Sequence, residues 1–278
     1  MSDVALRTRP SGSRLRSYAR AFGGLLLRDA RVLVREIVPF VLRTVMNPLL
    51  FVFVFAYVFP TIGQGFSGGA PDVSFATILV PGLVAVAVVF QGISAVALPL
   101  VNEFGRTREI EDRVMAPLPV GAVAVEKIVF GALQSVVAAA MVFPLVYLVP
   151  ATDVSVNFAR WPLLGLVVVL SSLTAGALGL AVGTVVRPQQ VPLIFSILVI
   201  PITFLGCVYY PWASLGSIRW LQIAVLVNPL VYMSEGLRAS LTPQLPHMPV
   251  PAFLGAITLS LTLLSTLGVR AFLGRVRS

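Results

Sequence analysis

The sequence is poor in the residues from which most catalytic and metal sites are built. Its 278 residues include one cysteine, Cys207, and one histidine, His247. A single cysteine excludes an intrachain disulfide and a cysteine-rich metal centre, and a single histidine argues against a histidine-based metal or acid–base site. The only lysine, Lys127, stands between Glu126 and Ile128, whereas a phosphate-binding loop needs glycine before that lysine and serine or threonine after it. We therefore expect no catalytic residue, cofactor or metal in this chain.

Charged residues are also scarce, at 11% against 58% apolar residues. Soluble domains carry about a quarter charged residues. Repeated apolar runs reach the roughly 20 residues that a helix needs to cross a bilayer core. The composition therefore predicts an all-α, multi-pass integral membrane protein. The net charge of +9 does not indicate a nucleic-acid partner, because the basic residues cluster at the ends of the apolar runs, where orientation signals lie.

Six apolar runs predict six transmembrane helices in a membrane domain that covers residues 38–278. Their approximate ranges are 38–59, 75–101, 124–149, 161–186, 191–209 and 251–269. The polar residues 1–13 are expected to be disordered. With both termini cytoplasmic, only Arg160, Arg219 and Arg238 of the 20 basic residues lie outside, which matches the positive-inside pattern of a cell-membrane protein.

A basic amphipathic helix is predicted over 14–37, directly before the first span. Apolar side chains fall on one face of this helix. The opposite face carries Arg20, Arg28, Arg31 and Arg35. Such a helix lies in the headgroup plane with its basic side toward anionic lipid, and a soluble partner-binding helix is the alternative. Asp29 interrupts the apolar face, and the pattern gives no reason for it.

The most polar stretch lies between the second and third spans, over 102–127. Its charged residues are Glu103, Arg106, Arg108, Glu109, Glu111, Asp112, Arg113, Glu126 and Lys127. A segment this polar between two membrane-length runs must lie in water. Alternating charge favours contact with a specific soluble partner over a tether to lipid headgroups, and an ordinary solvated loop is the alternative.

Polar side chains inside the predicted spans are few. They are Gln91, Ser94, Gln134, Ser171, Ser172 and Thr203. They could line a transport pathway, or they could join helices by hydrogen bonds, which is the commoner role. The cores of spans 2 to 6 lack charged residues, which disfavours a proton- or ion-driven transporter. Ala175, Gly179 and Gly183 form a strip of small residues that allows close helix packing.

The segment 211–250 is apolar but interrupted. Asn228 and Pro229 break its helix into two pieces that are too short to cross the bilayer. This pattern predicts an extracellular re-entrant hairpin, with a plain interfacial loop as the alternative. Glu235 and Arg238, three residues apart, could pair on one helical face.

In their order and spacing, these features resemble the type-2 permease subunits of ATP-binding cassette exporters over nearly the whole chain. Each motif by itself is weak. The motifs are the basic helix before span 1, Asn47-Pro48-Leu49, Phe75 with Pro81-Gly82, the stretch Arg108–Pro119, and Asn228-Pro229 with Glu235 and Arg238.

The resemblance implies that Glu103–Arg113 is the coupling helix, which docks into a groove of a cytoplasmic nucleotide-binding subunit. It also implies that 211–240 forms a pair of short extracellular re-entrant helices. We expect a homodimer or heterodimer of permeases above two ATPase copies, which bind the ATP and magnesium. The expected cargo is amphipathic, drug-like or lipid-like. A polysaccharide or glycolipid exporter of the same family, an ion-driven secondary transporter and a non-transport scaffold are the alternatives.

Overall fold

The structure is a computed structural model that describes residues 11–62, 74–104, 119–149, 154–190, 193 and 195–277. Within these ranges the regular structure is entirely helical. Five helices of the described part are long and apolar enough to cross a membrane. They are Ile37–Thr61, Phe75–Asn102, Val120–Leu148, Trp161–Val185 and Val250–Val276. The predicted all-α membrane fold is therefore confirmed, and five of its six predicted spans are observed as long helices.

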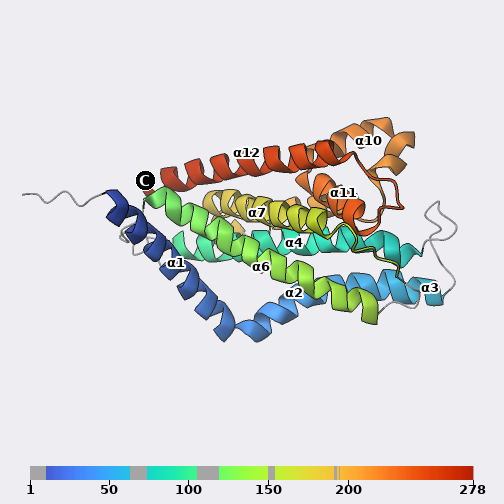
Figure 1. The fold of residues 1–278 in the computed structure, drawn as a ribbon, viewed down its shortest axis with the longest axis horizontal. Coiled ribbons are helices and arrows are strands. Elements are labelled where there is room, and N and C mark those ends of the chain that lie inside the picture. Colours follow the sequence, from blue (N-terminus) through green and yellow to red (C-terminus); the bar gives the residue numbers. More distant parts are fainter. Residues whose placement is uncertain are drawn as a thin grey trace, which may run out of the picture.

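The bundle is built around α4 (Phe75–Asn102). A membrane-length window of α4 is 83% buried, against 17% for the corresponding window of α12 (Val250–Arg277). The helices α6 (Val120–Leu148) and α7 (Trp161–Val185) pack on α4, and α12 packs on α7 (Figure 1). The apolar run that the sequence predicts as span 2 is thus the central helix.

Small residues set the spacing between α4 and α7, as the sequence predicts. A Cβ atom added to Gly179 would lie 2.8 Å from the carbonyl oxygen of Gly92. One added to Gly183 would lie 2.8 Å from the Cα atom of Ala97. Both distances are shorter than van der Waals contact, so only glycine allows the two backbones to approach this closely.

The predicted amphipathic helix is observed as α1 (Ser11–Arg35). A turn at Glu36 separates it from α2 (Ile37–Val52), which continues through the π-helical segment η1 (Phe53–Val58) and α3 (Phe59–Thr61). In Figure 1, α1 crosses the bundle obliquely beside the beginning of α6, at the end where α12 also ends. Residues 1–10 of the stretch predicted to be disordered lie outside the described residues.

The fifth predicted span, 191–209, is only partly a regular helix. Its described part contains the π-helical segment Phe195–Val199 and the short helix α9 (Ile200–Phe204), followed by turns. Pro201 lies in the first turn of α9 and lacks the N–H that would continue the hydrogen-bond ladder. This segment is not among the five long apolar helices, so the sixth crossing stays a prediction.

The segment before the last span forms short helices broken where the sequence predicts. They are η5 (Trp212–Ser217), α10 (Arg219–Ala224), η6 (Val225–Val227) and α11 (Pro229–Leu241). The Asn228 side chain accepts a hydrogen bond from the Leu230 N–H at 3.0 Å, and Pro229 occupies the first turn of α11. Asn228 and Pro229 thus end the preceding helical segment η6 and begin α11. The helix α11 packs against α4, α7 and α12.

Candidate functional site

A buried ion-pair cluster joins three helices at the end of the bundle that carries the charged loop. The Lys127 Nζ atom lies 2.8 Å from Glu103 Oε1 and 3.5 Å from Asp29 Oδ2. These residues come from the first turns of α6, the end of α4 and the inward face of α1. Their side chains are at most 9% exposed. Asp29, which the amphipathic pattern left unexplained, is therefore a partner of Lys127.

This cluster closes the base of the predicted coupling loop. Glu103 lies at the end of α4, where the loop begins, and Lys127 lies in α6, seven residues after that helix begins at Val120, so their ion pair joins the two helices that flank the loop. Glu103 accordingly points into the bundle rather than toward solvent. The other residues predicted for coupling lie outside the described residues, and their role stays a prediction. They are Arg106, Arg108, Glu109, Glu111, Asp112 and Arg113.

The last helix, α12, is attached to the bundle close to the base of the loop. Arg275 of α12 donates hydrogen bonds to the carbonyl oxygens of Thr184 and Val186, at the end of α7. Its guanidinium carbon also lies 4.6 Å from the centre of the Phe104 ring. Because Phe104 follows Glu103, the base of the loop contacts α12 as well as α1 and α6. Basic side chains near a helix C-terminus bind its last carbonyls favourably.

A cavity of about 600 Å³, which we call the four-helix cavity, opens beside this cluster between α1, α2, α4 and α6. Its charged lining residues are Arg28, Asp29, Glu36, Arg43, Glu103 and Lys127. Its uncharged polar lining residues are Ser94, Asn102 and Gln134. Apolar walls are supplied by Val32, Leu33, Leu98 and Phe130, among others. The cavity lining therefore combines charged, polar and apolar side chains, as a site for an amphipathic molecule requires.

Two of the predicted pathway residues join helices next to the cavity. The Gln91 Nε2 group donates to Gln134 Oε1 at 2.9 Å, and the Thr44 hydroxyl donates to Gln91 Oε1 at 3.1 Å. This chain of bonds links α2, α4 and α6. Gln134 lines the cavity at the same time, and so does Ser94 of α4. Gln91 and Gln134 thus have the interhelical role, and a role in the transport pathway stays a prediction.

The remaining predicted pathway residues lie elsewhere. Ser171 and Ser172 are buried in α7, and their hydroxyls have no hydrogen-bond partner among the described residues. Thr203 donates to the carbonyl oxygen of Val199, one turn earlier in the chain. Sequence reasoning did not identify Asp29 or Arg43 as site residues. The signal available for Asp29 was its position on an otherwise apolar helical face.

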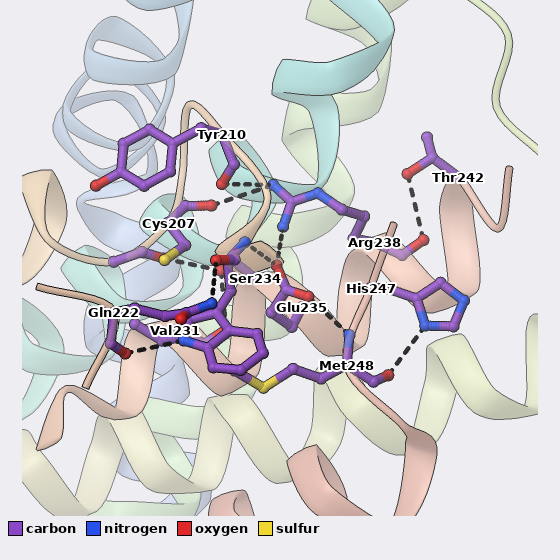
Figure 2. A network of polar contacts seen from close by, with 12 residues as sticks. Cys207, Tyr210, Gln222, Val231, Ser234, Glu235, Arg238, Thr242, His247 and Met248 are labelled. Atoms are coloured by element: carbon purple, nitrogen blue, oxygen red, sulfur yellow. Dashed lines mark hydrogen bonds and ion pairs between the residues drawn. The ribbon is translucent and has the colours of Figure 1, made fainter. Parts of the chain in front are cut away.

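A second polar network lies near α11, and Figure 2 shows it from close by. Arg238 donates to the Glu235 carboxylate, which confirms the predicted pair, and also to the carbonyl oxygens of Cys207 at 3.1 Å and Tyr210 at 3.5 Å. Glu235 in turn accepts from the backbone N–H groups of Trp212 at 3.0 Å and Met248 at 2.8 Å.

This network fastens the chain on both sides of α11 to that helix. Both charged side chains are at most 1% exposed, so the pair is a buried structural element rather than a surface contact. A buried pair needs further hydrogen bonds to offset the loss of hydration, and the backbone groups around it supply them. The predicted hairpin is therefore a packed unit of the fold, and its side of the membrane stays a prediction.

Comparison with known proteins places these features in one family. A search of curated proteins finds no match to the chain. The family model described as ABC-2 type transporter matches residues 21–242, which include the ion-pair cluster, the four-helix cavity and, except for Met248, the α11 network. The chain therefore belongs to the ABC-2 type transporter family, as a non-catalytic, multi-pass membrane permease of the kind that generally pairs with ATP-binding subunits.

Proposed function

We propose that the chain is the permease subunit of an ABC exporter that moves an amphipathic, drug-like or lipid-like cargo out across the cell membrane. A separate nucleotide-binding subunit hydrolyses the ATP, and two permeases work above two such subunits. The observation that carries the proposal is the family match together with the Lys127 cluster at the base of the loop. The amphipathic cargo class is supported by the mixed charged, polar and apolar lining of the four-helix cavity.

The cluster suggests how a push on the loop reaches the membrane domain. Glu103 and Lys127 join the two helices that flank the loop, and Asp29 joins Lys127 to α1. A partner that displaces the loop therefore moves α1, α4 and α6 as one unit. Rigid-body movement of packed helices is a common way to pass between two states of a protein.

The loop's role is tested by reversing two of its charges. The double substitution Glu109→Lys and Glu111→Lys should leave membrane insertion intact and reduce ATP hydrolysis to the rate of the ATPase subunit alone. The reason is that groups of the ATPase subunit that attract the two carboxylates would face ammonium groups instead. The matched control reverses Asp72 and Asp153, which lie in the predicted outer loops. Normal stimulation in the loop variant, or equal loss in the control, would remove the loop from the mechanism.

We further propose six crossings with both termini in the cytoplasm, residues 191–209 being the additional one. The shared location of α1, the start of α6 and the end of α12 at one end of the bundle supports this arrangement (Figure 1). A cysteine at Ser217, which is exposed, should react with a membrane-impermeant maleimide added outside intact cells. The native Cys207 is 0% exposed and does not compete. Reaction only after the membrane is opened would refute this orientation.

A further inference from the structure

We infer that the four-helix cavity binds the phosphate-bearing head of an amphiphile from the bilayer leaflet next to α1. The inference names a ligand class for the proposed permease, and in that respect it rests on the proposed function. Three features of the cavity carry it: an arginine and two hydrogen-bond donors that have no partner among the described residues, and apolar side chains in the same lining.

Arg43 is the first feature. It lies in α2 about 9 Å beyond the start of the helix, given a rise of 1.5 Å per residue. Its side chain lines the cavity, and it has no hydrogen bond or ion pair to any of the described residues. An arginine at this depth in a membrane segment is unfavourable unless it is paired or reaches water. A phosphate group satisfies it well, because guanidinium binds phosphate oxygens through two parallel hydrogen bonds.

The neighbouring polar groups are donors. The Gln134 carboxamide oxygen is used by Gln91, which leaves the Gln134 NH₂ group without an acceptor among the described residues. The Ser94 hydroxyl likewise has no partner there. Both side chains are at least nine-tenths buried and line the cavity. Free donors beside a free guanidinium favour an oxygen-rich anion over a cationic or purely apolar ligand.

The other charges of the cavity do not oppose this ligand strongly. Lys127, Asp29 and Glu103 form one cluster, so these two carboxylates already have a cation. Glu36 also lines the cavity, and among the described residues it has no partner. Its carboxylate repels a bare phosphate but attracts an amine on the same headgroup. The lining therefore favours a phosphate that belongs to a zwitterionic or mildly anionic head over a free phosphate ion.

The size and walls of the cavity favour an amphiphile. A volume of about 600 Å³ falls within the range of sites for drug-sized ligands. Leu98 and Phe130 line it from α4 and α6, and Val32 and Leu33 line it from α1. These apolar side chains can contact the first part of an acyl chain while Arg43, Ser94 and Gln134 hold the head.

The experiment measures binding to the purified full-length permease by native mass spectrometry in detergent. The probes are dioleoylphosphatidylethanolamine, dioleoylglycerol, which lacks the phosphate and its amine, and inorganic phosphate. The wild-type chain should bind the phospholipid at least tenfold more tightly than the diacylglycerol, and inorganic phosphate should not compete. Arg43→Gln should weaken phospholipid binding about tenfold or more, since it removes a charge-assisted contact. Arg35→Gln, an equal change at an exposed residue that does not line the cavity, should change it less than twofold.

A second variant, Leu98→Trp, fills the cavity from its apolar wall and leaves every charge in place. It should also lose phospholipid binding, and it decides the question if the Arg43 variant does not fold. Unchanged binding in these variants, or equal loss in Arg35→Gln, would overturn the inference. Competition by inorganic phosphate would show a free-anion site instead. No ATPase subunit is present, so this result is separate from the outcome of the loop charge reversal.

Discussion

Replacing Lys127 by methionine removes the cation that two buried carboxylates share. Glu103 and Asp29 lie 2.8 Å and 3.5 Å from its Nζ atom. Removing one partner of a buried ion pair costs about 3–5 kcal/mol, because the remaining charge stays buried. We expect the lower end, about 3 kcal/mol, since both carboxylates also line the four-helix cavity and can gain some hydration there. The lost free energy should mainly weaken the packing of α1 on the bundle, where its contacts are with α6 and α2.

The attachment of α1 can be measured by amide hydrogen exchange of the permease in lipid nanodiscs. Exchange of the α1 amides around Asp29 reports how often this helix detaches from the bundle. A change of about 3 kcal/mol corresponds to a roughly hundredfold rise in the detached population. The amides in the middle of α4 should be unaffected, because that helix is held by α6 and α7 on both sides.

Two controls make the result specific. Arg31→Met removes a cation from the exposed side of α1, and should change exchange less than twofold. Combining Lys127→Met with Glu103→Gln and Asp29→Asn removes all three charges of the cluster and should restore most of the protection, because the two carboxylates are then neutral amides. If the single Lys127 variant exchanges like the wild type, or the triple variant is as unprotected as the single one, the argument from the ion pair fails.

Two further predictions concern the stability of the fold in detergent. Arg238→Met and Glu235→Gln should each lower the free energy of unfolding by about 3–5 kcal/mol, because each leaves the other buried charge without its partner; equal thermal midpoints of wild type and Arg238→Met would contradict this. Gly179→Leu should cost about 1–3 kcal/mol by forcing α4 and α7 apart, whereas Gly165→Leu, where an added Cβ meets nothing within 4 Å, should not lower the thermal midpoint.

Much of the fold follows from local pattern. In a bilayer each backbone polar group must be bonded within its own segment, so an apolar run of about 20 residues becomes a helix whatever surrounds it. This is why α4, α6, α7 and α12 lie close to their predicted ranges. The break at Asn228–Pro229 and the pairing of Glu235 with Arg238 are also local, since both depend on residues within one helical turn or one cap.

The segment 191–209 shows where local pattern is insufficient. Its apolar content predicts a crossing, yet its described part contains a π-helical segment and only five residues of α-helix in α9. Hydropathy measures how favourable it is to bury the side chains of a segment. It does not show whether the backbone hydrogen bonds of a helix continue through that segment. Pro201 affects the ladder without changing the hydropathy.

The sequence by itself determined the membrane class, the amphipathic helix and the small-residue strip, because each depends on neighbours or on helical period. Only the tertiary structure decided that Lys127 meets Asp29, 98 residues away, and that Gln91 meets Gln134, 43 residues away. Periodicity tells which face of a helix turns inward, but not which helix it meets or at what height. The ion-pair cluster and the four-helix cavity depend on which helices meet and at what height along their axes. The packing of glycines between α4 and α7 helps to fix both.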